Sequence, residues 1–233
     1  MKLFLLLCST IFLQFSCSKK SDQLMFSNTA INAIDSIYYL ALGDSYTIGT
    51  SIDPSDNYPN QTFQNLTGAG FKMAVPQIIA KNGWTSLDLI NALKTTEKRN
   101  TYQVVSLLIG VNNQYQGRSM VEFESNFQSL LASAIVLTGN VPKKVFVFSL
   151  PDWGITPFAA GLDKQEIATE IDAYNTICAK YAKLYGANFI NITDDYRLQG
   201  FKTNYLAIDG LHPSKLIYAA WSKQLAQQII NGF

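Results

Sequence analysis

The chain has one histidine, His212, and three cysteines in 233 residues. Any proton transfer that depends on histidine therefore has one candidate, since imidazole exchanges protons most readily near neutral pH. Two of the cysteines, Cys8 and Cys17, lie in the first 17 residues. Cys178 is alone in the rest of the chain, so no disulfide can form there, and we expect it to be a small buried hydrophobic residue.

The sequence also lacks any concentration of charge of one sign. It has 18 basic and 17 acidic residues, a net charge of +1, and no basic stripe. Nucleic-acid binding therefore has no electrostatic signature in this chain. A hydrophobic fraction of 48% is sufficient for a core, and the length fits one domain. Nothing in the pattern predicts a particular oligomeric state.

A long apolar run occurs only at the N-terminus, where residues 3–15 follow Met1 and Lys2. This run is shorter than the ~20 residues that span a bilayer, and it has the form of a secretory signal peptide. We therefore expect a signal peptide over 1–17, a polar tether over 18–35 and a folded domain over 36–233. The alternative is a buried N-terminal strand or helix.

Cys17 lies where a bacterial lipoprotein carries its lipidated cysteine, and the small residue Ser16 before it fits that resemblance. Gln14 departs from the aliphatic residue that is usual there. We expect an exported protein, anchored to a membrane through Cys17 in the periplasm or at the cell surface. Secretion is the alternative if Cys17 is not lipidated, and we expect no other membrane contact.

Short apolar segments alternate with longer helical patterns in the remaining chain. Five segments with little polar alternation are expected to be strands: 37–42, 75–80, 104–109, 145–150 and 188–192. Strands of this kind are buried on both faces, as in a parallel sheet covered by helices. The predicted fold is α/β, a three-layer α/β/α sandwich with a five-stranded parallel sheet of the flavodoxin-like type.

Helix starts can also be located. Three of them carry capping signals: a capping box at Ser119 and Glu122, and looser versions at Thr85 with Asp88 and at Asp163 with Glu166. A final helix is expected to begin at Pro213, since proline is favoured in the first turn.

Ligands bind beyond the carboxyl ends of the strands in such a sheet. Four short segments should meet there: Gly43-Asp44-Ser45, Asn82-Gly83-Trp84, Gly110-Val111-Asn112, and Asp209 to His212. Together they suit acyl transfer, with Ser45 as the nucleophile, His212 as its base and Asp209 orienting the imidazole ring. The Ser45 and Gly83 N–H groups and the Asn112 carboxamide can form the oxyanion hole.

In this order, Ser45, Gly83, Asn112 and His212 resemble the four signature residues of the SGNH (GDSL) hydrolase family. The resemblance extends from about residue 37 to the C-terminus. It implies an α/β/α sandwich that works without a metal or an organic cofactor. It also implies a serine hydrolase acting on a carboxylic ester of a small molecule or glycan. The alternatives are a carbohydrate O-acetylesterase with the same site, or a catalytically silent binding lipoprotein.

Two positions depart from the family pattern. Tyr46 replaces the aliphatic residue that often follows the serine, and Asn113 stands where an acid is usual. We expect Asp44 to be a turn carboxylate that bonds local backbone N–H groups. Asp194 and Asp195 are rivals to Asp209 as the acid that orients His212.

Several aromatic residues also follow the strand ends. We interpret Tyr46, Trp84, Tyr115 and Trp153, with Phe158 nearby, as an apolar rim for an acyl chain or a sugar face. The alternative is that these rings pack within their own loops. Arg118 could meet an anionic group of the substrate or could be a solvated residue at a helix start.

Overall fold

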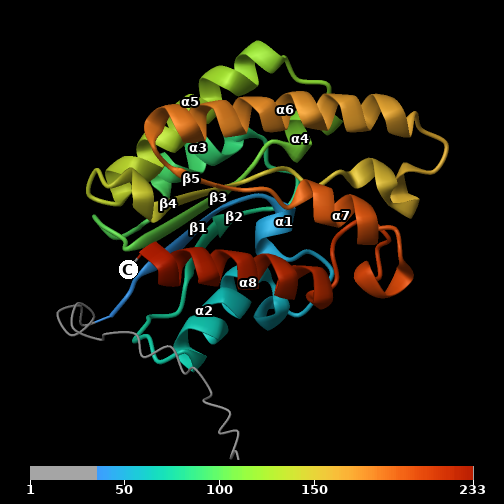
Figure 1. Ribbon diagram of the computed structural model, residues 1–233. Coiled ribbons are helices and arrows are strands. Elements are labelled where there is room, and N and C mark those ends of the chain that lie inside the picture. The colour runs from blue at the N-terminus through green and yellow to red at the C-terminus, as the bar shows by residue number, and fades with distance from the viewer. Residues whose placement is uncertain (1–35, 233) are drawn as a thin grey trace, which may run out of the picture.

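Five parallel strands form the centre of the molecule (Figure 1). The computed structural model describes residues 36–232, so the predicted signal peptide and the tether lie outside the described residues. The strands are β1 (Tyr39–Gly43), β2 (Gln77–Ala80), β3 (Val104–Leu108), β4 (Val145–Phe148) and β5 (Asn188–Ile190). Their order is β2-β1-β3-β4-β5 and every neighbouring pair is parallel, which confirms the flavodoxin-like arrangement.

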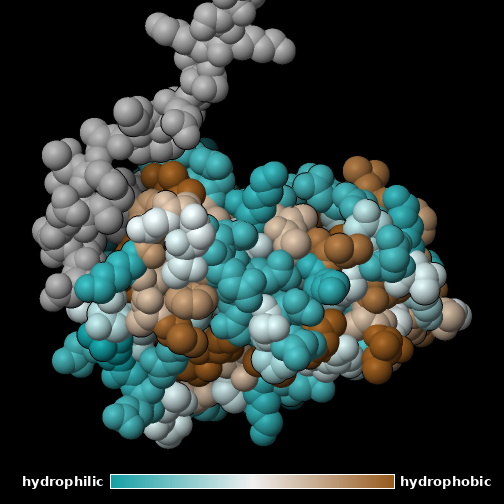
Figure 2. Space-filling model, turned by 90° about the horizontal axis from the view of Figure 1, so that it is seen from below, coloured by the Kyte–Doolittle hydropathy of each residue, from teal (hydrophilic) through white to brown (hydrophobic). Residues whose placement is uncertain are grey.

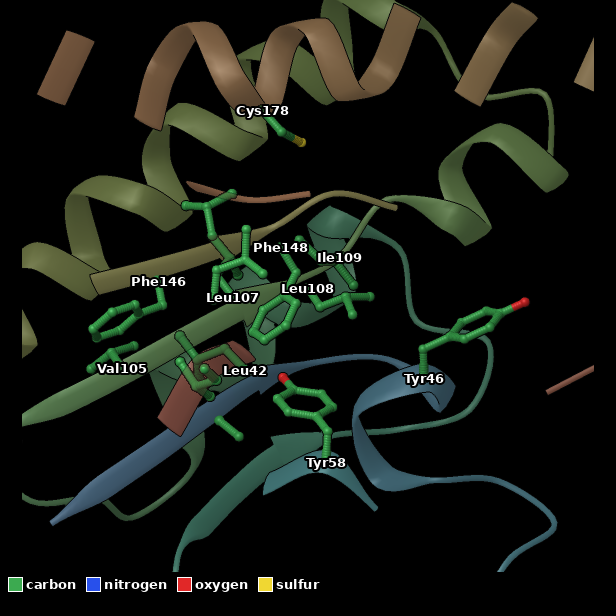
Figure 3. Packing of buried hydrophobic residues seen from close by; sticks show 14 of the residues in the cluster. Leu42, Tyr46, Tyr58, Val105, Leu107, Leu108, Ile109, Phe146, Phe148 and Cys178 are labelled. Atoms are coloured by element: carbon green, nitrogen blue, oxygen red, sulfur yellow. The ribbon is translucent and has the colours of Figure 1, made fainter. Parts of the chain in front are cut away.

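The inner strands are apolar on both sides because helices cover both faces of the sheet. Every residue of β1, β3 and β4 is buried, whereas the edge strands β2 and β5 are partly exposed. Below the sheet Tyr58 lies against Phe148, with ring centroids 4.9 Å apart, and Cys178 packs on the opposite side (Figure 3). Cys178 is fully buried, as predicted, and burial raises the pKa of its thiol.

The helices form the two outer layers (Figure 1). α2 (Tyr58–Gly68) and α8 (Lys215–Gly232) pack together on one face, while α3 (Ser86–Thr95), α5 (Met120–Leu137) and α6 (Lys164–Tyr185) cover the other. The short helices are α1 (Ser45–Ile48), α4 (Val111–Tyr115) and α7 (Thr193–Gln199). The 3-10 turns are η2 (Pro54–Asp56), η3 (Pro142–Lys144), η4 (Trp153–Ile155), η5 (Pro157–Ala159) and η6 (Thr203–Tyr205).

The capping signals mark real helix starts, but the complete capping box is not where the sequence placed it. Thr85 and Asp88 exchange both bonds of the box at the start of α3. At α5, Ser119 only accepts a bond from the backbone N–H of Glu122. Asp163 accepts from two backbone N–H groups at the start of α6.

Five predicted boundaries were wrong by two residues. β1 begins at Tyr39 rather than at 37, β4 ends at Phe148 rather than at 150, and β5 ends at Ile190 rather than at 192. β2 begins at Gln77 rather than Val75, because Pro76 has no N–H to donate to a ladder and Val75 is exposed. The last helix begins at Lys215 rather than Pro213. Pro213 instead forms an isolated antiparallel bridge with Leu206, which keeps the residues before the helix extended.

The outer surface is mixed in polarity. Seen from below, it is largely hydrophilic, with apolar side chains scattered between polar ones (Figure 2). Among residues 36–232, no helix combines the length and apolar character needed to cross a bilayer.

Candidate active site

A cavity of about 220 Å³ opens beyond the carboxyl ends of the strands. Its lining comes from α1, α4, η4, η5, the segment after β2 and the segment before α8. The lining residues are Ser45, Tyr46, Asn82, Gly83, Val111, Asn112, Tyr115, Trp153, Phe158, Leu211 and His212. Five distant parts of the sequence therefore meet at the edge where the parallel topology places ligands.

His212 is held by Asp209 at two points. The Asp209 Oδ1 atom accepts the His212 backbone N–H at 2.9 Å, and Oδ2 lies 2.7 Å from Nδ1 of the ring. The turn is fixed further by the Ala207 N–H, which donates to the His212 carbonyl at 2.8 Å. The imidazole is thereby oriented with Nδ1 toward the carboxylate, which leaves Nε2 for other partners.

The environment of Asp209 keeps its carboxyl group ionised. Partial burial alone would raise the pKa of Asp209, but the His212 ring, the Ser51 hydroxyl and the N–H groups of His212 and Leu211 lower it to about 2. A carboxylate that is always charged is the partner that a transiently protonated imidazole requires.

Ser45 begins α1 directly after β1, and its side chain lies at the pocket with only 3% of the residue exposed. The turn before it depends on Gly43, since a Cβ there would overlap the Thr47 side chain and the Leu108 carbonyl. No hydrogen bond joins the Ser45 hydroxyl to His212 in the described part of the chain. Bonds between nucleophile and base are often loose before substrate binds.

Three hydrogen-bond donors face the same cavity. Among residues 36–232, the backbone N–H groups of Ser45 and Gly83 have no hydrogen-bond acceptor. Gly83 has a φ of 79°, a conformation that residues with a Cβ rarely adopt. The Asn112 Nδ2 atom donates to the Trp84 carbonyl at 3.0 Å, which fixes the carboxamide and leaves its second proton for a ligand.

Three aromatic rings form one wall of the cavity. Trp153 meets Tyr115 edge-on at 5.3 Å and Phe158 at 6.1 Å between centroids. The Trp153 indole N–H donates to Oε1 of Gln114 at 2.6 Å, and Gln114 Nε2 donates to Glu170 at 2.7 Å. The position of the tryptophan is thus set by two partners that the sequence analysis did not identify.

Two residues proposed for substrate contact lie elsewhere. Trp84 is not among the cavity-lining residues, because its partly buried side chain packs against the hydrophobic core. Its carbonyl, rather than its ring, serves the site by orienting Asn112. Arg118 is exposed, does not line the cavity and bonds to Gln116. Tyr46, Tyr115 and Trp153 do line it.

Asn113, the departure from the family pattern, has a structural role. It is fully buried, accepts the Ser86 backbone N–H at 2.8 Å and donates to the Ser86 hydroxyl at 2.9 Å. Asn113 therefore ties α4 to the start of α3.

Asp44 is the turn carboxylate that the sequence predicted. Its Oδ1 atom accepts the Tyr46 N–H at 2.9 Å at the start of α1. Its Oδ2 atom is buried with no hydrogen-bond partner among the described residues. Burial raises the pKa of Asp44 from its ordinary value of 3.8 to about 7, against the lowering effect of backbone hydrogen bonds.

The rival acids do not reach His212. Asp194 accepts a bond from Asn191 at the start of α7, and Asp195 accepts one from Gln224. Among the described residues, no group of three histidine, cysteine or acidic side chains is arranged to hold a metal ion.

Residues 41–220 match the model of the GDSL-like Lipase/Acylhydrolase family. No significant match to a curated protein was found. Similar solved structures include a variant of an acetyl xylan esterase from Geobacillus stearothermophilus, at 16% identity with a TM-score of 0.63. The alignment covers 83% of this chain and 94% of that one.

A second similar structure is the lipase/acylhydrolase from Enterococcus faecalis, at 17% identity and a TM-score of 0.65. That alignment covers 84% of this chain and 96% of the other. A further acetyl xylan esterase, AlAXEase, has 18% identity and a TM-score of 0.65, with coverage of 82% and 98%. At such identities the structures establish a shared fold.

Proposed function

The chain belongs to the GDSL-like lipase/acylhydrolase family and is an ester-hydrolysing enzyme, and we propose that Ser45, His212 and Asp209 carry out the hydrolysis. The observation that carries this assignment is the double contact between Asp209 and His212 at the cavity that also contains Ser45. That arrangement gives the nucleophile a base, and gives the base a fixed orientation and a counter-charge.

In the first half of the reaction, the Ser45 hydroxyl attacks the ester carbonyl while His212 takes its proton at Nε2. The carbonyl π-bond electrons move to oxygen, and this oxyanion accepts bonds from the Ser45 and Gly83 N–H groups and the Asn112 amide. The tetrahedral intermediate collapses, the bond to the alcohol oxygen breaks, and His212 returns the proton to the leaving alcohol. The acyl group is then bound to Ser45.

The second half repeats these steps with water. His212 removes a proton from a water molecule, whose oxygen attacks the acyl carbonyl in the same oxyanion hole. Collapse releases the carboxylic acid and returns the proton to Ser45. Asp209 keeps its negative charge throughout, consistent with its low pKa.

The cavity favours a small acyl group. Its volume of about 220 Å³ is below the roughly 300–1,000 Å³ of pockets that hold drug-sized ligands. Tyr115, Trp153 and Phe158 also close one side of it. We infer that acetate-like groups fit the site better than long fatty chains.

A carbohydrate O-acetyl ester is the second candidate substrate, and one observation favours it. Tyr115 is 54% exposed beside the buried Trp153, so an aromatic surface is open to solvent at the mouth of the cavity. Such a surface can contact the apolar face of a sugar ring. Two of the structures described above are named as acetyl xylan esterases, and that activity is theirs.

Labelling with a fluorophosphonate probe tests the proposed catalytic residues. The wild-type enzyme should be labelled at Ser45, and Ser45→Ala and His212→Ala should each abolish labelling and reduce ester hydrolysis to near background while keeping the native melting temperature. Full activity in either folded variant would contradict the assignment.

A series of p-nitrophenyl esters, assayed beside acetylated xylan, tests the substrate class. A sharp optimum at acetate with turnover of the polysaccharide supports the O-acetyl ester proposal. An optimum at octanoate, with activity on lysophospholipid, would instead favour a lipase-like enzyme.

We also propose that the enzyme is an exported lipoprotein anchored at Cys17, a residue outside the described ones. The support is the apolar run over 3–15 followed by Ser16 and Cys17. Metabolic labelling with a fatty-acid analogue tests it, because Cys17→Ala should lose the label while a Cys178→Ala control keeps it. An unlabelled wild-type protein would contradict the proposal.

A further inference from the structure

The ring of Tyr46 lies against the imidazole of His212. The two ring centroids are 5.0 Å apart and the ring planes are inclined by 54°. Both residues are nearly buried, at 2% and 5% exposure. Tyr46 directly follows Ser45 in α1, so one short helix carries both the proposed nucleophile and a ring that touches the proposed base.

This contact matters because the hydrogen bond to Asp209 holds the imidazole ring at one end only. Asp209 fixes Nδ1 at 2.7 Å, but within residues 36–232 no hydrogen bond connects the ring to Ser45. A ring held only at Nδ1 can still swing about that bond. The ring of Tyr46 packs against the imidazole at a second place.

The hydroxyl of Tyr46 does not explain why a tyrosine occupies this position. It is buried and has no hydrogen-bond partner among the described residues, so it does not stabilise the fold. Burial, together with Tyr196 and Asp44 nearby, raises the pKa of Tyr46, so the hydroxyl stays protonated. The useful part of the side chain is therefore its ring.

Hydrogen bonds anchor the two chain segments that carry the rings of Tyr46 and His212. The Tyr46 side chain projects from α1 away from the buried group around Tyr58 and Leu42 (Figure 3). The Tyr46 N–H is bonded to Asp44 at 2.9 Å. On the His212 side, Tyr196 donates to the Leu211 carbonyl at 3.3 Å, which holds the residue preceding the histidine.

We propose that Tyr46 is a positioning residue whose ring keeps the His212 imidazole within reach of Ser45. The inference rests on the proposed function, since it presupposes that His212 transfers the proton. A displaced imidazole would slow proton transfer in both halves of the reaction, an effect larger than any change in the cavity wall that Tyr46 helps to line. The expected signature is a loss in kcat with little change in KM.

Substitutions that keep or remove the ring test this. Tyr46→Phe keeps the ring and should retain kcat within about 3-fold, whereas Tyr46→Leu should lower kcat about 10- to 100-fold, the size of effect that misplacement of a reacting group produces. Tyr46→Met, which fills space without a flat ring, carries the same prediction if the leucine variant fails to fold. Labelling by the fluorophosphonate probe should slow in parallel with kcat.

Tyr218→Leu is the matched control. Tyr218 is also fully buried, and its hydroxyl has no hydrogen-bond partner among the described residues. Its ring contacts the rings of Tyr58 and Trp221, however, and not that of His212. The Tyr218→Leu substitution should lower the melting temperature and leave kcat unchanged. An equal loss of kcat in this variant would assign the effect to general loosening and overturn the proposal.

Two further outcomes overturn it. A strong loss of kcat in Tyr46→Phe would make the hydroxyl, not the ring, the important part. Wild-type kcat in folded Tyr46→Leu or Tyr46→Met would show that the ring is dispensable. These outcomes can be told apart from a failure of the proposed function. If the proposed function were wrong, the wild-type enzyme would not be labelled or His212→Ala would stay active.

Discussion

Asp209 contacts His212 through both of its carboxylate oxygens, one on the backbone N–H at 2.9 Å and the other on Nδ1 at 2.7 Å. One acid thus fixes both where the histidine lies and how its ring is turned. The two residues are three positions apart, so the arrangement is contained in one turn of the chain.

Replacing Asp209 by asparagine should therefore lower kcat by roughly 10³- to 10⁴-fold. An amide can present its NH₂ group to Nδ1, which favours the wrong tautomer and removes the counter-charge. Steady-state kinetics on p-nitrophenyl acetate measures the loss, and KM should change little. Asp194→Asn is the control, since Asp194 bonds Asn191 and not His212. Equal losses in both variants would refute the role of Asp209.

Asn112→Ala should lower kcat by about 10²- to 10³-fold, because it removes one donor to the oxyanion. The neighbouring Asn113→Ala serves as comparison. Asn113 bonds Ser86 and does not line the cavity, so its loss should reduce the melting temperature while kcat is largely kept. If Asn112→Ala keeps full kcat, the carboxamide does not contribute to the oxyanion hole.

Asp44 predicts how stability depends on pH. Its pKa in the folded protein, about 7, lies above the ordinary value of 3.8, so between these two values the folded state binds a proton that the unfolded state releases. The contribution of this group to the unfolding free energy therefore falls as pH rises from about 4 to 7. Asp44→Asn keeps the bond to the Tyr46 N–H without the buried charge.

The melting temperature of Asp44→Asn should accordingly exceed that of the wild type by roughly 5 °C at pH 8.5, with a smaller gain at pH 5. Differential scanning calorimetry at the two values measures it. A gain that is equal at both values would mean that the carboxyl group does not titrate in this range.

Gln114→Leu should disturb the aromatic wall of the cavity. The substitution leaves the buried Trp153 N–H without its partner, which costs roughly 1–3 kcal/mol, whereas the exposed Glu170 carboxylate can bond to water instead. We expect a higher KM for substrates that touch the wall and a kcat on p-nitrophenyl acetate within about 3-fold of wild type.

Glu170→Gln is the control for this change. A glutamine oxygen can still accept the bond from Gln114, so the orientation of Trp153 should persist and KM should stay close to that of the wild type. A wild-type KM in Gln114→Leu as well would mean that the bond to Trp153 does not shape the substrate site.

The sheet could be predicted from sequence because its strands are buried on both faces. A run such as Val104 to Leu108 has no polar alternation, which is typical of a strand in a parallel sheet covered by helices on both faces. The predicted boundaries at Val75 and Pro213 were wrong, because whether a proline begins, ends or precedes an element depends on the hydrogen-bond partners that neighbouring segments offer. Those partners lie in segments that are distant in the sequence.

The candidate catalytic residues were also accessible from sequence. Asp209 and His212 are close in the chain, and Ser45, Gly83 and Asn112 each follow a strand of the sheet. Their convergence is a consequence of topology rather than of individual side-chain packing.

The contacts around the site could not be predicted from the sequence. Gln114 and Trp153 come from separate segments, and nothing in either segment marks the bond between them. The contact of Tyr46 with His212 is of the same kind. The side chain of Trp84 packs against the core and is not part of the cavity lining. An aromatic residue at a strand end can turn toward the core or toward the ligand, and packing alone decides between them.

The direction of the strands has a practical consequence. β1 begins at the edge opposite the cavity, and α8 starts beside His212 and runs back toward that same edge (Figure 1). Position 36 and the end of α8 therefore both face away from the catalytic opening. A reporter domain fused at either position, or a bead used for immobilisation, should leave the opening unobstructed.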